Sequence, residues 1–202
     1  MNLEFELMEA YFESNGFLIR QANEPVQTSG KKKNSDLPTM AIFNPLQDEN
    51  DRELGFRLFT GDLSRIRAAL VSLLGWGNSS FSNDCFNNDA RLSKFFKSEV
   101  ANEKWSLNVQ PGSSLAERGM GEFLRLLVVP NFPRSESKIK IVTELLQKAG
   151  VDGVLTLSAI LENLLRQTLP SGGSPSHSVF YLLGLLKAYD LVKEPQLDMF
   201  ED

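Results

Sequence analysis

The chain has 202 residues, of which 42% are hydrophobic and 23% are charged, and its formal net charge is -5 at pH 7. This length suits one large domain, or one domain with a small appendage, and allows a buried core. Net acidity disfavours nucleic-acid binding by the whole surface, although a local basic patch can still contact phosphates. No apolar run is long enough to span a bilayer, so we expect no membrane contact.

The scarcity of cysteine and histidine excludes two kinds of site, an internal disulfide and a zinc site built from His and Cys. Cys85 is the one cysteine of the chain, which excludes an internal disulfide and fits a reducing cytosol. With one histidine as well, a zinc site built from His and Cys is excluded. The acidic, amphipathic start, "MNLEFELMEAYFE", lacks the basic flank and cleavage site of a signal peptide. We therefore expect a cytoplasmic protein.

The first half of the chain predicts one helix followed by strands. Apolar residues at helical spacing from Leu3 to Phe12, with Gly16 behind them, predict a helix with a glycine C-terminal stop. Strands are expected at 17–21, 39–44 and 54–60, the last being the weakest, and a helical turn or a loop at 61–70. The run "ALVSLLGWG" fits a buried strand, with a helix end as the alternative.

The second half alternates helices and strands. Asp89 is the expected cap of a helix that continues through residue 105, and Ser158 the expected cap of a later one. "FLRLLVVP" is the clearest buried strand, and "DGVLTL" is a second one. The remaining helices are expected at 135–150, with a capping-box-like start and a glycine stop, at 158–169, and at 176–192 after Ser174 and Pro175.

This order of elements predicts an α/β fold with a mixed central sheet flanked by helices and a C-terminal helical extension. We expect three parts: an α/β core at 1–157, two helices packed on it at 158–194, and a flexible tail at 195–202 that carries a partner-binding motif. The helix-strand-strand-strand-helix-strand order of the core resembles the restriction-endonuclease-like family over roughly the first three quarters of the chain.

That resemblance implies a place for each catalytic residue of the family. Its members hold a divalent metal with a glutamate on the first helix, an aspartate near the second strand, and an acid-x-lysine pair on the third. The carried-over positions are Glu9 or Glu13, then Asp36, then Ser72 for the acid and Leu74 for the lysine. Because the last two are lost, the metal would keep at most two carboxylates, and no lysine would orient water.

Each of the vestigial candidates also has an ordinary structural explanation. Glu9 and Glu13 lie one helical turn apart, as on a solvated helix face, and Asp36 stands beside Ser35 and before Pro38, as in a turn. We therefore expect no confident catalytic residue, no metal and no cofactor. Mg²⁺ is expected only under the alternative of a metal-dependent DNA nuclease whose catalytic residues have migrated.

Two features are candidates for nucleic-acid contact within such a fold. Lys31, Lys32 and Lys33 form a basic run that is able to contact phosphate, or that is simply a solvated loop. Trp76, between two glycines, is able to stack on a base, or it is a buried anchor.

The tail carries the most specific motif. Gln196, Leu197, Asp198, Met199 and Phe200 resemble the pentapeptide by which bacterial polymerases and repair proteins hold the sliding clamp. By that likeness the Gln196 amide enters a small polar pocket, and the three apolar side chains fill an adjoining groove. The alternative is that the tail docks on its own domain.

These inferences together predict a non-catalytic accessory protein of DNA replication or repair, recruited to the bacterial sliding clamp and able to contact DNA. The two alternatives are the metal-dependent nuclease and a protein-interaction module without DNA contact. The sequence leaves the oligomeric state open.

Overall fold

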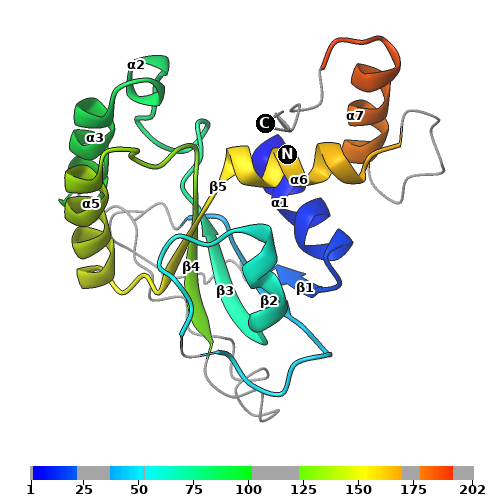
Figure 1. The fold of residues 1–202 in the computed structure, drawn as a ribbon, viewed down its shortest axis with the longest axis horizontal. Coiled ribbons are helices and arrows are strands. Elements are labelled where there is room, and N and C mark those ends of the chain that lie inside the picture. Colours follow the sequence, from blue (N-terminus) through cyan, green and yellow to red (C-terminus); the bar gives the residue numbers. More distant parts are fainter. Residues whose placement is uncertain (1, 22–36, 52, 102–122, 170–177, 193–202) are drawn as a thin grey trace, which may run out of the picture.

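The computed structural model describes residues 2–21, 37–51, 53–101, 123–169 and 178–192. One five-stranded sheet runs through the centre of the molecule, with its strands in chain order (Figure 1). The strands are β1 (Leu18–Gln21), β2 (Thr39–Phe43), β3 (Ala68–Leu73), β4 (Leu124–Val129) and β5 (Gly153–Thr156). The first three strands pair antiparallel, whereas β4 is parallel to both β3 and β5. The predicted mixed α/β architecture is confirmed.

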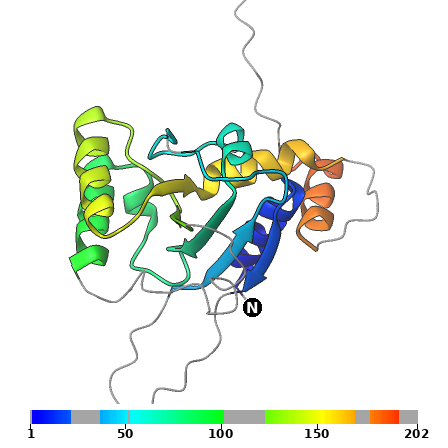
Figure 2. The same cartoon turned by 90° about the horizontal axis from the view of Figure 1, so that it is seen from below.

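Helices cover both faces of this sheet (Figures 1 and 2). One face carries α1 (Leu3–Ser14), the 3-10 helix η1 (Thr60–Arg65), α6 (Leu157–Gln167) and α7 (Ser178–Ala188). The other face carries α2 (Asn83–Phe86), α3 (Asp89–Ala101) and α5 (Glu136–Lys148). The sheet therefore separates two apolar clusters, one under each layer of helices.

Helices on both faces of the sheet explain the apolar run Leu126–Val129 in β4. Leu126 and Val128 point into the cluster below α1 and α6, whereas Leu127 and Val129 point into the cluster below α3 and α5. All four side chains are buried. Because alternate residues of a strand face opposite sides, a strand covered on both faces is apolar at every position instead of at every second one.

The C-terminal helices share the core of the N-terminal helix. Ile160 and Leu164 of α6 and Val179 of α7 belong to the same buried cluster as Met8 and Phe12 of α1. Helix α1 ends as predicted, because Gly16 behind it has φ +86°, a backbone conformation that favours glycine.

The expectation of a strand at 54–60 is wrong. Only Arg57 forms an isolated bridge to Val154 of β5, through the hydrogen bonds Leu58 N–H to Val154 O (2.9 Å) and Val154 N–H to Phe56 O (2.7 Å). The chain leaves β5 directly afterwards and enters η1 at Thr60. The contact with the sheet is therefore too short to extend it.

Two expected helix caps are corrected by one residue or two. Asn88 caps α3, because its Oδ1 accepts the N–H groups of Ala90 (3.0 Å) and Arg91 (3.1 Å). Thr156 caps α6, because its Oγ1 accepts the Ala159 N–H at 3.3 Å, in place of Ser158. The type of capping side chain was therefore predicted correctly in both helices, whereas the capping residue itself was one or two positions off.

Asp89 holds the segment in front of α5 instead. Its Oδ2 accepts the N–H groups of Arg134 (3.0 Å) and Ser135 (2.7 Å). These bonds, that of Ser135 first, lower the pKa of Asp89 because they stabilise its charged form. The carboxylate thereby ties α3 to the start of α5.

Within the ranges described, no helix combines the length and the apolar composition needed to cross a membrane.

Candidate functional site

The family resemblance places two of its catalytic positions, Ser72 and Leu74, at the end of β3, next to the start of β2. Thr39 and Ser72 are paired across β2 and β3, and their hydroxyl oxygens lie 2.9 Å apart. Thr39 also donates to the Leu37 carbonyl at 2.8 Å, and both hydroxyl side chains are buried. Leu74 is fully buried beneath α3 and α5. The two polar side chains therefore satisfy one another, and neither Ser72 nor Leu74 offers a charge to a metal or a water molecule.

The loop after β3 is fixed by a carboxylate from the first helix. Glu4 accepts the backbone N–H groups of Trp76 (Oε1, 2.8 Å) and Gly77 (Oε2, 3.1 Å). A Cβ at Gly75 would collide with the carboxylate of Glu4, so the missing side chain allows this close approach. The sequence interpretation missed Glu4, although the glycines flanking Trp76 were the signal of a backbone that another group approaches closely.

A second carboxylate holds the far side of the same loop. Glu99 of α3 is buried, and it accepts both the hydroxyl and the backbone N–H of Ser80. Asn78 braces the middle, since it accepts the Gly75 N–H (2.7 Å) and donates to the Leu73 carbonyl (2.8 Å). The loop is thus tied to a helix on each face of the sheet.

Trp76 lies on this loop, which hydrogen bonds hold in place, and its side chain is partly exposed. Its ring packs edge-on against Phe81, with centroids 4.6 Å apart, and lies 6.0 Å from the ring of Phe86. It still keeps 39% of its surface exposed. Trp76 is therefore not a fully buried anchor, although its ring packs on the loop's neighbours, and stacking on a base stays a prediction.

The structure places both carboxylates predicted on the first helix, Glu9 and Glu13, on α1. Glu9 Oε1 accepts from Gln21 Nε2 of β1 at 2.8 Å, and Glu13 is exposed near the end of α1. Asp36 and Lys31 to Lys33 lie outside the described residues, as does the tail pentapeptide from Gln196 to Phe200. Among the residues that are described, no group of three or more His, Cys, Asp or Glu side chains is placed to hold a metal ion.

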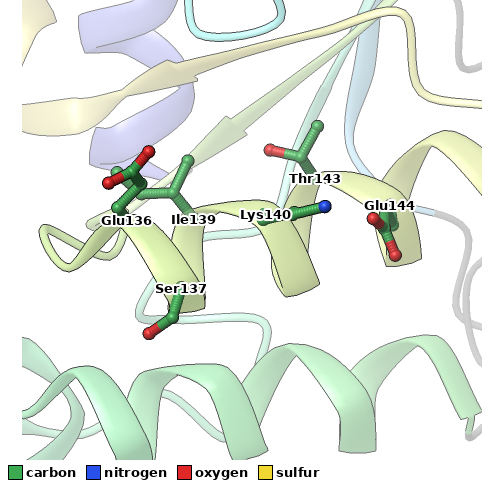
Figure 3. A pocket seen from close by; sticks show the side chains of 6 residues that line it. All are labelled: Glu136, Ser137, Ile139, Lys140, Thr143 and Glu144. Carbon is green, nitrogen blue, oxygen red and sulfur yellow. The ribbon is translucent and has the colours of Figure 1, made fainter.

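A shallow hollow of about 530 Å³ lies along α5 (Figure 3). Its described lining comes from this one helix: Glu136, Ser137, Ile139, Lys140, Thr143 and Glu144. The side chains are spread along the length of the helix in Figure 3 and do not converge on one point. A site for acid and base catalysis needs groups that converge on a reacting atom, so this lining offers a surface and not a reaction centre.

Comparisons of the chain with protein-family models, with curated proteins and with solved structures found no match.

Proposed function

We propose that this chain is a non-catalytic accessory protein of bacterial DNA replication or repair, with a nuclease-derived scaffold, which is recruited to the sliding clamp by its C-terminal pentapeptide. The observation that carries the proposal is the full match of Gln196, Leu197, Asp198, Met199 and Phe200 to the clamp-binding pattern. The scaffold binds DNA or another replication or repair protein.

The element order supports the scaffold part of the proposal. Helix α1 precedes the antiparallel strands β1, β2 and β3, and α3 then precedes the parallel strand β4. This order is similar to the core of the restriction-endonuclease-like family. The fold alone assigns no activity, because related scaffolds carry many functions.

The chemistry at the end of β3 supports the absence of catalysis. Ser72 is occupied by its hydrogen bond with Thr39, and Leu74 is part of the apolar core. A buried leucine cannot orient or deprotonate a water molecule, and a serine hydroxyl is a much weaker Mg²⁺ ligand than a carboxylate.

The composition of the tail supports recruitment. A short segment with dense apolar anchors gains affinity only where a preformed groove removes those anchors from water. Burial of a Leu, a Met and a Phe offers on the order of 1.5–3 kcal/mol each. After the costs of association this suits a Kd in the micromolar range, which permits exchange on a shared clamp.

Replacing Leu197 and Phe200 together by alanine is expected to weaken clamp binding by at least about 100-fold, because two apolar anchors are lost. Isothermal titration calorimetry of the full-length chain against a bacterial sliding clamp measures this. Glu201→Gln is the matched control, since it alters the tail next to the motif and spares its anchors. A wild-type chain without detectable binding, or a double variant with unchanged affinity, would refute the recruitment.

Neutralising Lys31, Lys32 and Lys33 to glutamine is expected to weaken DNA binding and to flatten its salt dependence, because each phosphate contact contributes a slope of about -0.9 in log K against log salt. Electrophoretic mobility shifts at several salt concentrations measure both quantities. The control changes Lys138 and Lys140 of α5 to glutamine. An equal effect in the two variants removes the DNA role of the basic run. Absence of any DNA shift in the wild type favours the protein-interaction module without DNA contact.

A plasmid-nicking assay with Mg²⁺ or Mn²⁺ distinguishes the alternative of a metal-dependent nuclease from the non-catalytic proposal. The proposal expects no metal-dependent nicking by the wild type. Cleavage that requires the metal and disappears in Asp36→Ala would overturn the non-catalytic assignment and leave the clamp contact standing.

A further inference from the structure

The outward face of α3 carries positive charge and no acid. Arg91, Lys94 and Lys97 are exposed and follow one another at three-residue spacing, so they form a cationic stripe along one side of the helix. The two acids of α3 are engaged elsewhere, because Asp89 accepts N–H groups in front of α5 and Glu99 is buried. In a chain of net charge -5, one helix face thus gathers three cations.

The cationic stripe is accessible to an anionic partner. Helices α3 and α5 lie together at one end of the molecule in both views (Figures 1 and 2). Lys94 and Lys97 take part in none of the ion pairs that the structure shows among its described residues. Arg91 pairs with Asp84 of α2, and these two side chains are 57% and 73% exposed. Because an exposed ion pair contributes little stability, a phosphate is able to replace Asp84 as the partner of Arg91.

Two partly exposed aromatic rings, Trp76 and Phe86, lie beside the N-terminal end of α3. Phe86 belongs to α2, the same short helix whose Asp84 pairs with Arg91, and its ring lies 6.0 Å from that of Trp76. The ring of Phe81 connects this aromatic pair to α3, because it packs edge-on against both Trp76 and Phe95. The aromatic pair is therefore fixed next to the Arg91 end of the cationic stripe.

We infer that this surface binds single-stranded DNA, with the phosphates on the cationic stripe and one unpaired base on the aromatic pair. Cations that follow the backbone, together with aromatic rings on which bases stack, are the combination that proteins use for single strands. Trp76 and Phe86 are 39% and 37% exposed, which leaves on the order of 150 Å² of ring surface. This area suits one base and is far below the roughly 800 Å² that each partner of a standard protein interface buries. The inference rests on the DNA contact of the proposed function, and it names the form of DNA and the face that binds it.

The loop that carries Trp76 is already held in place for such a contact. Glu4 accepts the N–H groups of Trp76 and Gly77, and Asn78 joins the Gly75 N–H to the Leu73 carbonyl. Binding to a loop that is ordered beforehand avoids the entropic cost of ordering it. The loop also follows the carboxyl end of β3, which is parallel to β4, and open α/β sheets bind their ligands beside such ends.

Fluorescence anisotropy of the full-length chain tests the inference with a labelled oligothymidylate of about 20 nucleotides and a duplex of the same length. The wild type is expected to bind the single strand more tightly than the duplex. Changing Arg91, Lys94 and Lys97 to glutamine is expected to weaken single-strand binding at least about tenfold. The slope of log K against log salt should shrink by about 2, because each phosphate contact contributes about 0.7. The matched control removes three exposed cations that lie on other elements: Arg57, Lys148 and Arg166.

Trp76→Ala tests the stacked base. It is expected to lower the affinity for the single strand by about 5- to 100-fold and to leave the affinity for the duplex unchanged. Trp76→Phe keeps an aromatic ring and is expected to retain most of the single-strand affinity. The glutamine substitutions on α3 are at exposed positions, so the charge test stands whatever the stability of Trp76→Ala.

Three results would overturn the inference: no binding of the single strand, tighter binding of the duplex, or equal weakening by the α3 variant and its control. Single-strand binding that needs Lys31, Lys32 and Lys33 but not the α3 cations would also overturn it, while the DNA contact of the proposed function would stand. A failed titration against the sliding clamp leaves this test unaffected, so the two failures are distinguishable.

Discussion

The variant Phe132→Ala is expected to lose about 3–5 kcal/mol of unfolding free energy, the range for truncating a fully packed phenylalanine. Phe132 is 1% exposed and lies between the rings of Phe96, with centroids 6.1 Å apart, and Phe56, at 6.5 Å. It follows β4 and fills the space between the sheet and α3, so its loss leaves a cavity that surrounding side chains fill only in part.

Urea unfolding followed by far-UV circular dichroism measures this loss. Phe86→Ala is the matched control, because Phe86 belongs to the same face of the molecule but is 37% exposed. We expect the control to cost less than half as much. Equal costs for the two variants, or a cost near zero for Phe132→Ala, would contradict the assigned packing of this layer.

The second large effect is a loss of stability at alkaline pH that Tyr11 causes. Its ring is buried on α1, and its hydroxyl lies 3.2 Å from Thr60 Oγ1 of η1. Burial raises the pKa of Tyr11 from 10.0 to about 12, the Thr60 hydrogen bond opposes that rise, and the charge of Asp62 adds to it. The phenolate is disfavoured in the folded state because it would lose its hydration.

Proton linkage gives the direction in which the stability changes with pH. Since the pKa is higher in the folded state, the unfolded state loses the proton first as the pH rises. The stabilisation is complete below pH 10 and is lost as the pH passes through about 12. Two pH units correspond to a loss on the order of 3 kcal/mol.

Comparing urea unfolding of the wild type and Tyr11→Phe between pH 9 and pH 12 isolates this contribution, because all other titrating groups are common to both. The wild type is expected to lose stability more steeply. Tyr181→Phe is the control, since Tyr181 is 59% exposed and its removal should leave the slope unchanged. Parallel curves for wild type and Tyr11→Phe would contradict the burial of this hydroxyl.

Local patterns of the sequence predicted the elements whose cause is local. The apolar run of β4, the helical spacing of α1 and the glycine stop at Gly16 depend on neighbours a few residues away, so they were visible in the sequence. The strand expected at 54–60 failed for the opposite reason. Its residues suit an extended chain, but the length of its pairing with β5 depends on where the chain turns into η1.

In the candidate site, too, some features were predictable from the sequence and others depend on the tertiary structure. The amino acids present at Ser72 and Leu74, and the pentapeptide of the tail, are properties of the sequence by itself, and they determine which chemistry is available. Only the tertiary structure decided that Glu4 reaches the loop after β3, and that Asp89 binds the start of α5 in place of capping its own helix. Those contacts join residues 72 or 46 positions apart, and no local preference encodes a distance of that kind because it depends on how the whole sheet and its helices pack.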